Sequence, residues 1–92
     1  MTAHDDARFR DQVNAGPGGA MTDEVGVITG DLTLTTVTRP DGLADIHIAY
    51  TGAEETYTLT GSPAPIPQDG LHALHERALA RIREGGAAQA PQ

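Results

Sequence analysis

The chain of 92 residues contains no cysteine, no tryptophan and no lysine, and only 3% of its residues are aromatic. Without cysteine, neither a disulfide framework nor a cysteine-based zinc site can stabilise a small fold. No apolar run approaches the roughly 18 residues of a membrane-spanning helix, and the N-terminus lacks the basic start and apolar stretch of a signal peptide. Folding must therefore rest on burial of apolar side chains, and we expect a cytoplasmic protein that does not bind a membrane.

Positive charge is also scarce. The chain has 13 acidic residues against 6 basic ones, all of them arginine, for a net charge of -7. A polyanion such as DNA or RNA is repelled by such a chain, so we expect no ordinary nucleic-acid binding. One alternative that this charge leaves open is an acidic mimic of nucleic acid, which would occupy a basic groove of another protein.

Glycine and proline gather near both ends of the chain. The Gly-Pro-Gly-Gly run at 16–19 is typical of a flexible joint. Before it, residues 5–15 offer only Phe9 and Val13 to anchor a short helix, which is too little without tertiary contacts. We therefore expect this part of the chain to be largely disordered.

Three regions follow from this distribution. The predicted organisation is a flexible N-terminal segment at 1–23, a globular domain at 24–85 and a disordered C-terminal tail at 86–92. We expect residues 1–20 to be dispensable for folding because they bring so little apolar surface.

Strand patterns begin in the second quarter of the chain. Residues 31–38 alternate apolar side chains with threonine, a β-branched residue that tolerates water, as expected for a sheet with one solvated face. The Arg-Pro-Asp-Gly sequence at 39–42 is a strong turn signal. Residues 45–51 alternate again, which predicts a hairpin.

A third strand is predicted at 55–60, which completes an antiparallel meander. Residues 25–28 either add a fourth strand or extend the first one through a bulge at Gly30. Val37 is out of phase with the preceding leucines, which indicates a bulge near Thr35 and Thr36 or a locally covered outer face.

A single helix is predicted after the strands. Residues 61–67 contain several prolines and form a stiff crossover, and Asp69 is the expected N-cap. An apolar stripe runs from 71 to 83, and Gly85 ends the helix. The expected fold is α+β, with a three- or four-stranded antiparallel β-meander and one C-terminal helix packed on one face. The predicted members of the stripe are Leu71, Leu74, His75, Ala78 and Ile82.

Three histidines are candidate ligands of a metal or a small molecule. His72 and His75 are one helical turn apart, and His47 on a strand could supply a third ligand. However, His75 shares the apolar stripe, His72 flanks it, and His47 lies on the opposite sheet face by parity. Packing or surface roles are therefore favoured, and we expect His75 to be buried and His72 exposed.

No catalytic or cofactor motif is present. Ser62, the only serine, follows a glycine in a proline-rich crossover, which is a poor support for a nucleophile. The glycine-rich run at 16–19 lacks the Lys and Ser or Thr of a phosphate-binding loop. We expect no catalytic residue, no metal and no cofactor.

The outer face of the predicted sheet is rich in threonine. A plain solvated sheet face explains it first, because threonine favours strands. The functional interpretation is a flat docking surface, and we expect a non-catalytic interaction or regulatory module that binds a protein partner, or forms a weak homodimer, through a sheet edge or this face. The alternatives are a small-ligand or metal-binding domain that uses the histidines, and the acidic mimic. The candidate partner-binding residues are Thr33, Thr35, His47, Thr51, Thr56 and Thr58.

Overall fold

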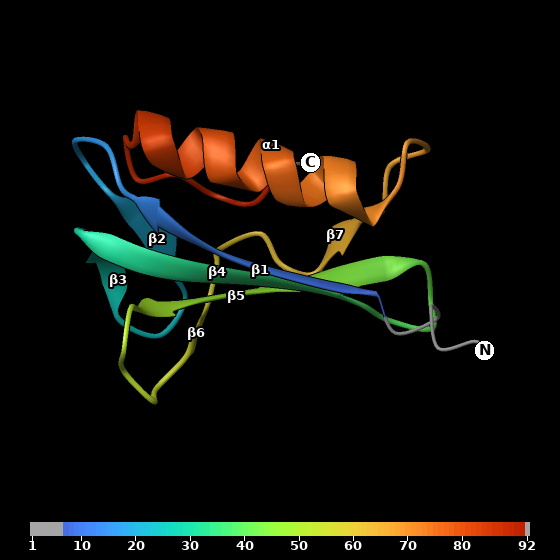
Figure 1. Ribbon diagram of the computed structural model, residues 1–92, viewed down its shortest axis with the longest axis horizontal. Helices are drawn as coiled ribbons and strands as arrows, with labels where there is room; N and C mark the ends of the chain where they lie inside the picture. Colours follow the sequence, from blue (N-terminus) through green and yellow to red (C-terminus); the bar gives the residue numbers. More distant parts are fainter. Residues whose placement is uncertain (1–6, 92) are drawn as a thin grey trace.

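The computed structural model describes residues 7–91 and shows an α+β fold, as predicted. Figure 1 shows a single helix, α1, lying along one face of an antiparallel sheet. The sheet has the strand order β1-β4-β5-β6, with β7 also paired to β5, and a separate two-stranded sheet joins β2 and β3. The elements are β1 (Arg8–Asn14), β2 (Ala20–Thr22), β3 (Gly26–Ile28), β4 (Asp31–Thr38), β5 (Leu43–Tyr50), β6 (Tyr57–Thr58), β7 (Ala64–Pro65) and α1 (Leu71–Glu84).

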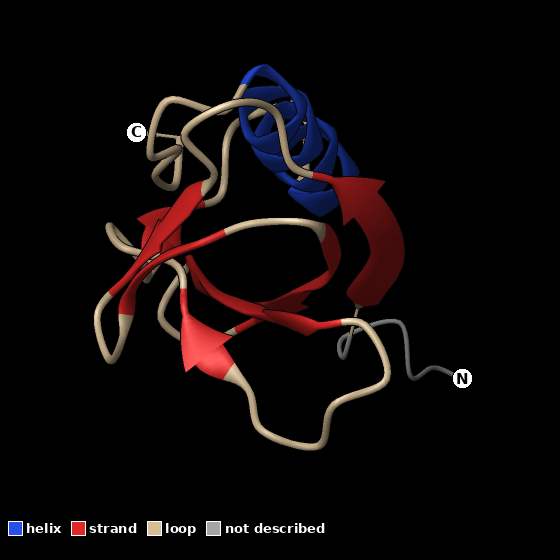
Figure 2. Cartoon of the chain, turned by 90° about the vertical axis from the view of Figure 1, so that its left-hand side faces the viewer, coloured by secondary structure: helices blue, strands red, loops and turns tan. Residues whose placement is uncertain are grey.

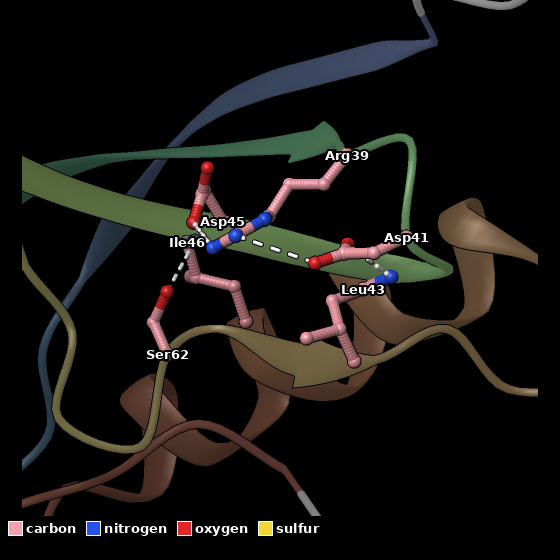
Figure 3. Close-up of polar contacts among 6 residues, drawn as sticks. All are labelled: Arg39, Asp41, Leu43, Asp45, Ile46 and Ser62. Carbon is pink, nitrogen blue, oxygen red and sulfur yellow. Dashed lines mark hydrogen bonds and ion pairs between the residues drawn. The ribbon is translucent and has the colours of Figure 1, made fainter.

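The central hairpin of β4 and β5 forms where the alternating pattern predicts it. The turn closes with the backbone N–H of Arg39 donating to the carbonyl of Leu43 at 2.8 Å. The Arg39 guanidinium lies 3.3 Å from the carboxylates of both Asp41 and Asp45 (Figure 3). Gly42 supplies the positive φ of 83° that this turn requires.

The expected bulge near Thr35 and Thr36 is absent. The register between β4 and β5 runs without interruption from Leu32 opposite Tyr50 to Thr38 opposite Ala44. Strand parity therefore turns Thr36 inward, where it is fully buried, and Val37 outward. The apparent phase error of Val37 reflects a threonine in the core and a half-buried valine on the outer face.

Residues 25–28 differ from both predicted alternatives. The strand at Gly26–Ile28 pairs with Ala20–Thr22 and neither joins the main sheet nor extends β4. The predicted third strand is shortened to the two residues of β6, although Leu59 after it is fully buried.

The helix forms as predicted, and its apolar stripe is buried. It ends at Gly85, whose N–H donates to the carbonyl of Arg81. The N-cap is Gly70 rather than Asp69, and no side chain caps the first turn. Asp69 lies one residue before this cap and instead accepts a hydrogen bond from Arg77 at 2.8 Å.

The expectation of a disordered or helical segment before residue 16 is wrong for the described residues. Residues 8–14 form β1, which pairs with β4 from Arg8 opposite Val37 to Asn14 opposite Asp31. Val13 belongs to the core. Residues four apart share one face in a helix and also in a strand, so the spacing of Phe9 and Val13 does not distinguish the two structures.

The predicted flexible joint and tail are packed against each other. The N–H of Gly16 donates to the carbonyl of Ile82 at 2.9 Å, and the N–H of Gly86 donates to the carbonyl of Pro17 at 2.6 Å. Ala88 and Ala90 are buried, and Ala90 donates to the carbonyl of Thr60. The small residues therefore allow the two backbones to approach closely. Glycine-rich composition is typical both of such close packing and of a flexible segment, so composition alone does not distinguish them. Residues 1–6 and 92 of the predicted termini lie outside the described residues.

Two neighbouring glycines test this packing. A Cβ at Gly85 would overlap the carbonyl oxygen of Pro17, whereas a Cβ at Gly86 would meet no atom within 4 Å, and both residues have positive φ. The substitution Gly86→Ala should cost about 1–2 kcal/mol, the usual penalty of a left-handed conformation. Gly85→Ala should cost at least twice as much, because the backbones must also separate. Urea denaturation of both variants measures the difference, and equal losses would show that the two segments are not in contact.

Candidate functional site

The predicted threonine surface lies on the sheet face opposite α1, and it is hollow rather than flat. Thr33 and Thr35 of β4, His47 of β5 and Thr56 in the following loop line a cleft of about 530 Å³. Figure 1 and Figure 2 show that the loop leading to β6 lies on the side of the sheet away from α1. Residues 52–54 and 56 of this loop line the cleft. Parity and register therefore bring these four predicted residues together.

Thr51 and Thr58 do not line this cleft, because their hydroxyls bind neighbouring segments. Thr51 donates to Asp31 at 2.9 Å and lies 2.9 Å from the hydroxyl of Thr33. The hydroxyl of Thr58 donates to Glu24 at 2.7 Å. Two of the six predicted residues thus hold neighbouring segments together instead of lining the cleft.

The turn between β2 and β3 docks on β6 through Glu24. Its carboxylate also accepts the backbone N–H of Thr58 at 2.7 Å. These bonds stabilise the charged form, the backbone bond most strongly, and His47 adds a smaller favourable field, so the pKa of Glu24 lies below its ordinary value of 4.5. The ionised carboxylate therefore favours the folded state.

This link predicts an acid-sensitive contribution to stability. Because the folded pKa of Glu24 is lowered, its contribution is complete above about pH 4.5 and is lost as the pH falls through the folded value. NMR titration of the Glu24 carboxyl should give a pKa below 4.5. Thr58→Val should raise that pKa only part of the way, since the backbone N–H remains, and Thr56→Val is the matched control. An unchanged pKa in Thr58→Val would contradict the contact.

The three histidines do not converge. His75 is fully buried and His72 is exposed, as predicted, and both lie on α1 against the ring of Phe9, with centroids 5.6 Å and 5.0 Å from it. His47 lies on the opposite sheet face. Among residues 7–91, no group of three His, Cys, Asp or Glu side chains is placed to hold a metal ion.

His75 forms the centre of a hydrogen-bond chain across the core. Its Nδ1 lies 2.8 Å from the hydroxyl of Thr36 on β4, and its Nε2 lies 2.8 Å from the carboxylate of Asp11 on β1. With the proton on Nε2, the ring donates to Asp11 and accepts from Thr36, so both nitrogens are satisfied. Sequence patterns missed this chain because its three members lie far apart along the sequence.

A hydroxyl, an imidazole and a carboxylate in this order also occur in nucleophilic enzymes. Here, however, Thr36 and His75 are both 0% exposed, so a substrate has no access to the hydroxyl. Ser62, the other hydroxyl considered, accepts a hydrogen bond from the backbone N–H of Ile46 at 2.9 Å and attaches the crossover to β5 (Figure 3). Both hydroxyls are placed to hold structure.

Burial of its imidazole between two hydrogen-bond partners makes His75 far less replaceable than its neighbour His72. His75→Gln should destabilise the fold by about 1–3 kcal/mol, because Gln cannot reach both partners and leaves a buried polar group without one. His72→Gln, one turn earlier and exposed, should change stability by less than about 0.5 kcal/mol. Thermal unfolding of the two variants makes the comparison. Similar values for both would mean that the chain contributes nothing.

Strand β1 presents one edge that no described residue covers. The bonds from Thr38 N–H to Ala7 and from Ala15 N–H to Gly30 identify the odd-numbered positions as hydrogen-bonded to β4. The backbone groups of the even-numbered positions therefore point away from the sheet. Within residues 7–91 nothing bonds to them, and the residues concerned are Arg8, Arg10, Gln12 and Asn14.

Composition does not reveal this edge, because Phe9 and Val13 are the only large apolar residues of the segment. The signal that could have revealed it is the alternation of polar residues at 8, 10, 12 and 14 with Phe9 and Val13, which has the period of a strand.

No helix within residues 7–91 has the length and apolar character needed to span a membrane. Comparisons of the chain with protein-family models, with curated proteins and with solved structures found no match.

Proposed function

We propose that this protein is a non-catalytic interaction module that binds an extended segment of a partner protein along β1. The observation that carries the proposal is the free edge of β1, seven residues long, whose outward N–H and C=O groups bond to no described residue. An added strand gains main-chain hydrogen bonds at such an edge, and its alternate side chains supply specificity.

The other edge of the sheet is less suited to this role. β5 is already paired with β6 and with β7, so little of its backbone remains free. β1 is also supported from one side, because Asp11 and Phe9 contact His75 of α1. A rigid strand loses little conformational entropy when a partner strand binds.

A second copy of the chain competes for the same edge. Antiparallel pairing of two β1 strands about Asp11 would place Arg10 opposite Gln12 on the outer face, but it would also place the two Asp11 carboxylates opposite each other, which weakens the pairing. The net charge of -7 on each copy opposes association at low salt. Self-association should therefore be weak and should strengthen as salt screens the repulsion.

One substitution blocks the edge without removing a bond to β4. The N–H of Gln12 points outward, so Gln12→Pro removes one hydrogen-bond donor of the edge. Proline is tolerated at such edge-strand positions, where the N–H faces solvent. Gln12→Ala keeps the donor and is the control. Gln12→Pro should abolish binding of the partner protein. It should also abolish salt-dependent dimerisation, which light scattering measures. Its free energy of unfolding should change by less than about 2 kcal/mol. Gln12→Ala should behave as the wild type.

Hydrogen exchange of the complex gives an independent measure. The amides of Arg10 and Gln12 should become protected when the partner binds, since both then donate to the added strand. A partner that binds Gln12→Pro as well as the wild type, with no new protection at these amides, would refute strand addition.

A further inference from the structure

The outer face of the sheet carries a row of hydrogen-bond donors across three strands. Arg10 of β1 lies opposite Thr35 of β4, and Thr35 lies opposite His47 of β5. Neighbouring strands are about 4.8 Å apart, so the three side chains leave the sheet within roughly 10 Å of one another. Arg8 stands two residues before Arg10 on the same face.

These donors make no side-chain hydrogen bond or ion pair in the part of the chain that the structure describes, although His47 lies in the field of the Glu24 carboxylate. The guanidiniums of Arg8 and Arg10 make no ion pair or side-chain hydrogen bond with residues 7–91, in contrast to Arg39 and Arg77. The hydroxyl of Thr35 and the ring of His47 likewise make none, whereas the neighbouring Thr33 is bonded to Thr51. Unsatisfied donors therefore gather on one side of the cleft, although the chain as a whole is acidic.

The cleft has the size and shape of a small-molecule site. Its volume of about 530 Å³ lies within the range usual for ligand pockets, roughly 300–1,000 Å³. Tyr50, which is 43% exposed, lies at its margin, but strand parity directs its ring to the face opposite His47. Glu54 lines it as well, from the loop after β5, and opposes the charge of the arginines.

From this geometry we infer that the cleft binds a small organic anion through a carboxylate or phosphate group. The planar guanidinium of arginine donates two parallel hydrogen bonds to either oxyanion. Arg8 and Arg10 hold the oxyanion at the β1 side, the hydroxyl of Thr35 and the ring of His47 donate to it from the sheet, and the loop before β6 lies against the organic part. This site is separate from strand addition, because it uses side chains and not the outward backbone of β1.

Titration with two probes tests the site and identifies the oxyanion. Inorganic phosphate and citrate are each added to ¹⁵N-labelled full-length protein at constant pH and ionic strength, with sodium chloride as the blank. At least one probe should produce saturable shifts of the Arg10, Thr35 and His47 amides, with a Kd of about 1 mM or tighter. Shifts with phosphate alone or with citrate alone assign the site to that group.

Charge-matched variants separate this site from general attraction of anions. Arg10→Gln should weaken binding about tenfold or more, because charge-assisted hydrogen bonds are lost. Arg81→Gln removes the same charge from α1, across the sheet from the cleft, and should leave the Kd unchanged. Glu54→Gln should tighten binding, and Thr35→Val should weaken it without altering the shape of the side chain.

The inference is overturned if neither probe shifts these amides more than sodium chloride does. It is also overturned if Arg10→Gln and Arg81→Gln weaken binding equally while both variants melt as the wild type does. Gln12→Pro should retain anion binding, so a failure of strand addition and a failure of this site are told apart.

Discussion

The hydrogen-bond chain from Asp11 through His75 to Thr36 is the interaction on which the rest of the structure depends. It joins β1, α1 and β4, and it is made at a histidine that is fully buried. A slip of β1 by one residue would turn Asp11 to the opposite face and leave the imidazole without its partner. A rotation of α1 would remove His75 from both strands. The chain therefore fixes the register of the edge strand and the orientation of the helix together.

That register determines what the edge strand presents to solvent. With Phe9 and Val13 facing the helix, Arg8 and Arg10 must face outward, beside Thr35 and His47. The same parity turns the backbone groups of the even-numbered positions away from β4. The free edge and the anionic-ligand cleft are thus two consequences of one strand pairing. Close contact between the backbones of Gly16 and Ile82 continues this arrangement to the C-terminal end of α1.

Local periodicity predicted the elements whose own residues specify them. The alternation at 31–38, the turn at 39–42 and the stripe that contains Leu74 and Ile82 are confirmed in β4, its hairpin turn and α1. β1 was missed because Asp11, a charged residue, stands between Phe9 and Val13 on the inward face and interrupts the apolar alternation; its side chain stays 55% exposed and bonds to a histidine 64 residues away. The glycines at 16–19 were misread because close backbone packing and flexibility favour the same residue. Parity placed Thr33, Thr35 and His47 on one face, but the arginines beside them could not be added before β1 was known.

Amide hydrogen exchange of the uncomplexed monomer along β1 tests the central claim most directly. If β1 is an edge strand in the register set by His75, the amides of Phe9, Asp11 and Val13 exchange slowly because they donate to β4, and those of Arg10 and Gln12 exchange fast because they point to solvent. Alternation of slow and fast exchange along the strand is therefore the expected result. Uniformly fast exchange from residue 8 to residue 14 would show that the segment is not part of the sheet and would contradict both the buried hydrogen-bond chain and the edge that depends on it.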